Sequence, residues 1–177
     1  AWGRLLVLVL GSSTYSYTIM LTTFLAGLAI GAWVGARSLK AWPEPILAAA
    51  LCQIQVALTT YLGLYLFREL PFLYVVAYHS LQPSPRGLLI VQLALACGVM
   101  ILPTIGLGAM FPIIIDGLRP KESDTPRLVG RAYAWNTVGA ILGSIVTGFW
   151  LVPRWGSRDA LLLGVAGSAL LGLAGLM

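Results

Sequence analysis

Charged side chains are scarce in this sequence, and their scarcity argues against a water-soluble domain. Of the 177 residues, 10% are charged and 59% are hydrophobic, whereas a soluble domain carries about 25% charged residues. Only six residues are acidic, and none of them lies inside a long apolar run. The sequence therefore gives no support for a proton relay built from carboxylates within a membrane.

Cysteine and histidine are nearly absent as well. The two cysteines, Cys52 and Cys97, lie in separate apolar runs, and His79 is the only histidine. These residues form neither a disulfide framework nor a metal site. No motif for catalysis or for a cofactor is present, so we expect no catalytic residue, metal or cofactor in this segment. The net charge of +5 comes from residues that flank apolar runs, so nucleic acid is not an expected partner.

Long apolar runs dominate what is present. A helix needs about 20 apolar residues to cross a bilayer, and several runs meet or approach this length: about Thr14 to Ala36, Pro45 to Phe67, Leu88 to Ile115, Val129 to Val152 and Ala160 to Met177. We therefore predict an all-α, polytopic transmembrane helix bundle that forms a single domain over residues 1–177, with the lipid bilayer as its partner.

The first apolar run reaches only Leu10, about half of a spanning helix. It is read as a truncated first helix, which brings the expected total to about six and suggests that the sequence is a fragment of a longer chain. We predict connections at Arg37 to Pro45, Arg119 to Arg127 and Pro153 to Arg158. Arg68 to Gly87 is predicted to be an interfacial loop with an aromatic belt. The distribution of Lys and Arg weakly favours a cytoplasmic location for the first two connections.

Small residues recur every four positions in two of the predicted helices. One stripe holds Gly27, Gly31 and Gly35, and the other consists of two neighbouring rows, with Gly139 and Gly143 in one and Gly148 in the other. Small residues on one face allow two membrane helices to approach closely. Helix packing is the first interpretation of both stripes, and a sliding surface used in transport is the second.

Polar residues within the apolar runs are candidates for a polar cavity. Asn136 and Thr137 are the strongest candidates, because an amide in hydrocarbon needs a hydrogen-bond partner. Such residues either fix helix register through an interhelical hydrogen bond or line a cavity that receives a ligand. The full candidate set is Asn136, Thr137, Tyr133, Thr104, Thr23 and Arg4, and Arg4 has the further alternative of reaching the interface by snorkelling.

Several blocks of sequence resemble a known family. These are RAYAWNTVGAILG from Arg131, the following residues up to Gly156, FLAGLAIG from Phe24, and PTIGLGAMFP from Pro103. In this order they resemble the membrane domain of bacterial spermidine synthase-like proteins. The resemblance implies a six-helix domain similar to half of a major facilitator transporter, located in the bacterial inner membrane. It also implies a cytoplasmic aminopropyltransferase domain following the helices.

Three functions follow as expectations. The first is a membrane domain that either anchors an aminopropyltransferase domain involved in polyamine biosynthesis or moves a polyamine or related small molecule across the bilayer. The second is a half-transporter that acts as a homodimer around a shared site. The third is a non-catalytic subunit that packs through its glycine stripes in a larger membrane complex.

Overall fold

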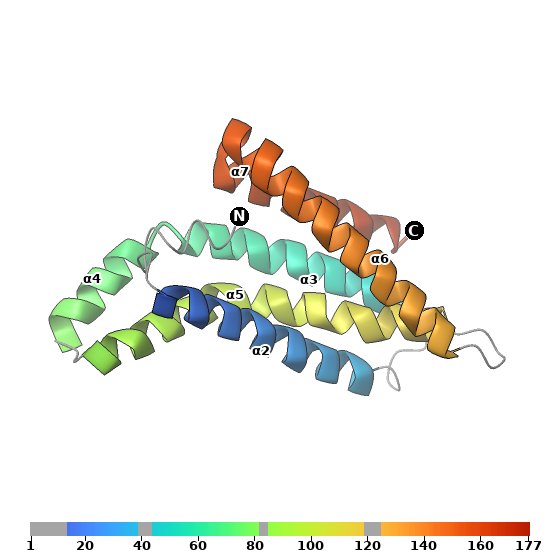
Figure 1. The fold of residues 1–177 in the computed structure, drawn as a ribbon, viewed down its shortest axis with the longest axis horizontal. Helices are drawn as coiled ribbons and strands as arrows, with labels where there is room; N and C mark the ends of the chain where they lie inside the picture. Colours follow the sequence, from blue (N-terminus) through green and yellow to red (C-terminus); the bar gives the residue numbers. More distant parts are fainter. Residues whose placement is uncertain (1–13, 39–43, 82–84, 119–124) are drawn as a thin grey trace.

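The computed structural model describes residues 14–38, 44–81, 85–118 and 125–177, and these residues are almost entirely helical with no strand among them. The helices are α2 (Thr14–Ser38), α3 (Pro45–Leu66), α4 (Leu70–Leu81), α5 (Pro85–Gly117) and α6 (Thr125–Ile145), followed by the π-helix η1 (Val146–Leu151) and α7 (Val152–Ala174). Helices α2, α3 and α5 lie side by side, and the hairpin of α6, η1 and α7 crosses them (Figure 1).

Four helical stretches in the described residues are long and apolar enough to cross a membrane, as expected of a multi-pass membrane protein. They are Thr14–Ser38, Pro45–Leu66, Gly87–Gly117 and Pro126–Ala174. Large apolar side chains such as Leu21, Leu25 and Leu58 are more than half exposed, as expected for side chains that face lipid rather than water. The predicted first helix and Arg4 lie outside the described residues, and the total of six helices stays a prediction.

The last stretch reverses direction at one glycine. Its 49 residues would extend about 73 Å as a straight helix, more than twice the bilayer core. Gly156 interrupts it with φ 84° and ψ 169°, and α7 returns beside α3 (Figure 1). The break lies inside the connection predicted at Pro153 to Arg158.

The interfacial loop predicted for Arg68 to Gly87 is wrong for most of its length. Residues Leu70–Leu81 form α4, and Pro85 already begins α5. Pro71 is the second residue of α4, where a missing N–H costs no helical hydrogen bond. Leu70 is 1% exposed and joins a core cluster with Met20 and Val99. Pro71 and Pro85 therefore stand at the starts of helices and not in a loop.

The most extensive helix contact joins α2 and α5. Helix α2 buries one face, made of Ser16, Met20, Thr23, Gly27, Gly31 and Gly35. This spacing of three or four residues is the repeat of a single helix face. Helix α5 continues as one helical element through Pro103 and Pro112, so the residues that meet this face all come from one helix.

Candidate functional site

The α2 glycines lie directly against α5. A Cβ added at Gly27 would meet the Thr104 side chain, one at Gly31 would meet the backbone of Ile105, and one at Gly35 would lie 2.7 Å from the carbonyl oxygen of Ala109. Only glycine lets the two backbones come this close. The first glycine stripe is thus placed at a helix contact.

Two of the candidate polar residues lie at this same contact. Thr23 and Thr104 are 1% and 4% exposed. The Thr104 hydroxyl donates to the carbonyl oxygen of Met100 at 2.8 Å, and the Thr23 hydroxyl lies 3.8 Å from the sulfur of Cys97. Both hydroxyl groups therefore have local partners and do not open onto a cavity.

The other described candidates lie on α6. Asn136 and Thr137 are exposed, and the Thr137 hydroxyl donates to the carbonyl oxygen of Tyr133 at 2.9 Å. The Tyr133 ring packs edge-on against Phe111 of α5, with centroids 4.8 Å apart. The structure therefore separates the candidates into one group at the α2–α5 contact and another on α6, while Arg4 lies outside the described residues.

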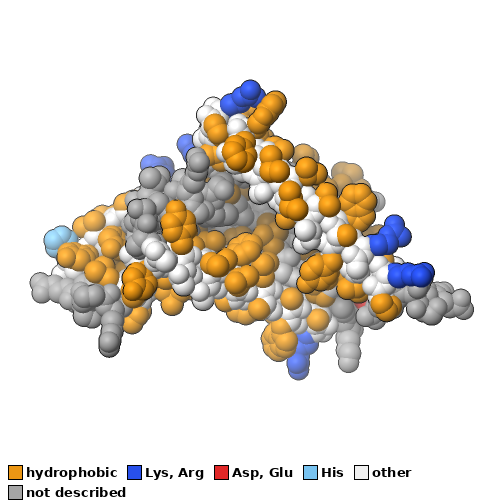
Figure 2. All heavy atoms as spheres, viewed as in Figure 1, with side chains coloured by type: hydrophobic (Ala, Val, Ile, Leu, Met, Phe, Trp, Pro, Cys, Tyr) orange, Lys and Arg blue, Asp and Glu red, His pale blue; other side chains and the backbone are white. Residues whose placement is uncertain are grey.

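The second glycine stripe faces open space. No atom of the described residues, beyond each glycine's own helix and chain neighbours, lies within 4 Å of a Cβ added at Gly139, Gly143 or Gly148. Nearly every residue of α6 and η1 is exposed, and the hydrophobic side chains along α6 are visible in Figure 2. The face of α6 defined by Asn136, Gly139 and Gly143 is called the α6 face below, and Gly148 of η1 is equally open. The α6 face has the composition of a packing surface without a described partner.

An apolar cavity of about 260 Å³ lies between α2, α3 and α5. Its polar contributors are Ser38, Cys52 and Gln55, and its wall includes Gly35 and Gly106. A Cβ at Gly106 would collide with the Gln55 side chain. The cavity thus exists beside a glutamine that the sequence analysis did not single out.

Gln55 joins α3 to α5. Its amide nitrogen donates to the carbonyl oxygen of Leu102 at 2.8 Å and lies 3.4 Å from the Thr59 hydroxyl. Gln55 could have been found from the sequence, because it is an amide side chain inside an apolar run. The same feature made Asn136 a candidate. Hydrogen bonds between membrane helices are worth about 0.6 kcal/mol on average and up to about 2 kcal/mol.

A Gln55→Leu substitution is expected to destabilise the chain by about 1 kcal/mol, because it removes the hydrogen bond to Leu102. Unfolding by denaturing detergent, followed by circular dichroism, measures the change. Gln53→Leu on the same helix is the matched control. The side-chain amide oxygen of Gln53 is buried without a hydrogen-bond partner in the described residues. Replacing Gln53 by leucine is therefore expected to leave stability unchanged or to raise it. Equal losses for both variants would contradict the assigned role of Gln55.

The described residues contain no cluster of three or more His, Cys, Asp or Glu side chains that could hold a metal ion. No protein-family model, curated protein or solved structure matches the chain. The sequence blocks, the helix contacts and the exposed α6 face are therefore the features that bear on function.

Proposed function

We propose that this chain is the membrane domain of a spermidine synthase-like protein and that it anchors a cytoplasmic aminopropyltransferase domain to the bacterial inner membrane. One observation carries the proposal beyond the sequence resemblance. The blocks FLAGLAIG and PTIGLGAMFP are far apart in the chain, yet Gly27 and Gly31 of the first contact Thr104 and Ile105 of the second. The two blocks thus form one helix interface, which gives a physical reason for both to be present together.

The interface between these two blocks supports a role in membrane anchoring and not a role in catalysis. Its hydroxyl groups bond locally, and the helices that carry it are apolar enough to cross a bilayer. In this proposal, catalysis belongs to the aminopropyltransferase domain, and the membrane helices determine where that domain operates. Six helices with half of a major facilitator arrangement are part of the same proposal.

Fractionation of cells that express the full-length gene product tests the anchoring function. Transfer of an aminopropyl group to a labelled diamine is expected in the washed membrane pellet. A variant that lacks all the membrane helices, including the predicted first one, is expected to keep the activity in the soluble fraction. The proposal fails if the membrane-bound gene product transfers no aminopropyl group, or if the activity of the intact protein is recovered in the supernatant.

The α6 face favours a second candidate function, a half-transporter that forms a homodimer. Gly139 and Gly143 lack described neighbours, and Asn136 on the same helix is exposed. An amide facing lipid is costly, whereas an amide at a helix pair in a dimer finds a partner. Apposed α6 faces would place polar groups of both copies along one central seam, as a translocation path for a polyamine requires.

Cysteine cross-linking tests this second function. Ala140→Cys, introduced together with Cys52→Ser and Cys97→Ser, is expected to give a disulfide-linked dimer in membranes. Adding Gly143→Leu is expected to reduce the cross-linked fraction by about tenfold, because a leucine separates the two backbones. Proteoliposomes of the parent chain are expected to take up labelled polyamine. Absence of both cross-linking and uptake above that of empty vesicles would rule out the half-transporter.

A further inference from the structure

A second cavity lies where α3 ends and α7 begins. It has a volume of about 400 Å³, within the range of small-molecule sites. Polar side chains that line it are Tyr61, Tyr65, Arg68 and Arg158, and Leu64 and Leu162 contribute apolar wall. This cavity is called the arginine pocket. It shares no residue with the apolar cavity or with the α6 face.

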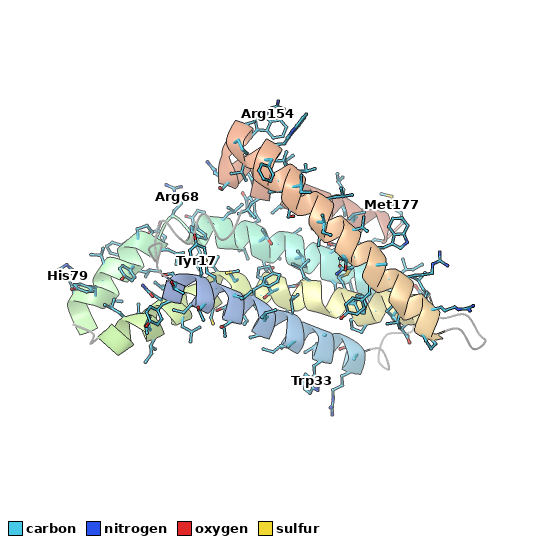
Figure 3. All side chains as sticks on the ribbon, viewed as in Figure 1. Tyr17, Trp33, Arg68, His79, Arg154 and Met177 are labelled. Atoms are coloured by element: carbon cyan, nitrogen blue, oxygen red, sulfur yellow. The ribbon has the colours of Figure 1, made fainter. Side chains whose placement is uncertain are left out.

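Antiparallel packing of α3 and α7 creates the arginine pocket. A Cβ added at Gly172, near the end of α7, would lie 2.6 Å from Ile54 and 3.0 Å from the Ala50 carbonyl oxygen. Because α7 runs back along α3 from this contact, its first turns reach the last turn of α3. Arg158 therefore lines the same cavity as Arg68, which Figure 3 shows just beyond the left-hand end of α3.

The charges at the arginine pocket are unbalanced. Two guanidinium groups line it and no carboxylate does. Glu69 and Asp159 are the next residues in sequence, but neither lines the pocket, and among the described residues no ion pair joins them to Arg68 or Arg158. Two like charges brought to one cavity repel each other, and an anion bound between them would remove that repulsion.

The residues around the pocket are typical of the level of lipid headgroups. Arg154, at the start of α7, stacks over the ring of Trp150 at 4.3 Å, and Tyr61 and Tyr65 lie in the last turns of α3. Tryptophan and tyrosine are enriched where a membrane meets water. An arginine fork matches the oxygens of a phosphate, and the two phenols add hydrogen-bond donors.

We propose that the arginine pocket binds an anionic phosphate ester. The guanidinium groups of Arg68 and Arg158 hold the phosphate oxygens, and the phenols of Tyr61 and Tyr65 donate further hydrogen bonds. Two sources share this chemistry: the headgroup of an anionic phospholipid and a free phosphomonoester. The proposal does not depend on the anchoring or transport functions.

Binding measurements on the purified chain in detergent micelles test the pocket. The probes are fluorescent phosphatidylglycerol, fluorescent phosphatidylcholine and free glycerol phosphate. Phosphatidylglycerol is expected to bind more tightly than phosphatidylcholine. Arg68→Gln and Arg158→Gln are each expected to raise its Kd about fivefold, because one basic residue at an anionic surface contributes about 1 kcal/mol. The double variant is expected to raise it more than about twentyfold.

Arg154→Gln is the matched control, since it removes the same charge from the same end of α7 but lies outside the pocket. It is expected to change the Kd less than about twofold. Arg68→Lys keeps the charge but loses the fork, and an intermediate Kd is expected. Circular dichroism establishes that each variant is folded. Competition by glycerol phosphate would identify a free phosphomonoester as the ligand, and its failure to compete would identify the lipid.

Two results would overturn the proposal. One is an equal rise in the Kd for phosphatidylglycerol in the Arg154→Gln variant. This result would mean that the overall positive charge at the start of α7 attracts the lipid. The other is the absence of saturable binding by every phosphate probe to the folded parent chain.

Discussion

Replacing Gly31 by valine is expected to destabilise the chain by about 3 kcal/mol, at the upper end of the usual cost of overpacking. A Cβ at Gly31 would lie 2.8 Å from the carbonyl carbon of Ile105 and 2.9 Å from its Cα. These are backbone atoms of α5, so a change of side-chain rotamer cannot relieve the collision. The two helices must separate, and the buried face of α2 then loses its partner.

Gly98→Val provides the control for this prediction. Gly98 lies on α5, the partner helix, and no atom outside its own helix is described within 4 Å of an added Cβ. The same substitution is expected to change stability by less than about 1 kcal/mol there. Denaturing-detergent titrations of both variants give the comparison. Equal stability of Gly31→Val and Gly98→Val would show that α2 and α5 are not in close contact.

Gly156→Ala is expected to cost about 2 kcal/mol for a different reason, namely backbone strain. With φ 84° and ψ 169°, Gly156 occupies a region essentially restricted to glycine, where another residue pays about 1–3 kcal/mol. Space around it is open, since no described atom outside its immediate chain neighbourhood lies within 4 Å of an added Cβ. The cost therefore comes from the turn itself and weakens the return of α7 onto α3.

Thermal unfolding in micelles measures the effect of Gly156→Ala. Gly164→Ala is the matched control, because Gly164 lies in the regular part of α7 and also faces open space. Alanine is favoured over glycine in a helix by up to about 1 kcal/mol, so this control is expected to be neutral or stabilising. A stabilised Gly156→Ala chain would mean that α6 and α7 do not turn at this residue.

The positions of most helices follow from the sequence because apolar length alone defines a membrane span. The predicted runs from Thr14, Pro45 and Leu88 correspond to α2, α3 and α5, and the Pro-Gly region before Arg158 contains the reversal. Helix α4 was missed because its prolines were read as breakers, although Pro71 stands in a first turn. The π-helix η1 leaves no comparable trace in composition, since its residues fit an ordinary helix equally well.

The candidate site was less predictable because sequence shows which residues are small or polar but not which helix they face. Gly27 and Gly139 belong to similar stripes, yet one contacts Thr104 and the other faces open space. Lipid and a helix partner both accept apolar surface, so hydrophobicity does not distinguish the two. The sequence shows Arg68 and Arg158 only as basic residues that flank apolar runs, because their position at one cavity depends on the pairing of α3 with α7.

Helix α5 also fixes how this protein relates to the bilayer around it. Its 33 residues extend about 50 Å, whereas the hydrocarbon core is about 30 Å thick. The excess must be taken up by tilt or by emergence of one end into the headgroup region. Since α2 and α3 both pack on α5, all three would incline together. The length of one helix would then incline the whole bundle relative to the bilayer normal.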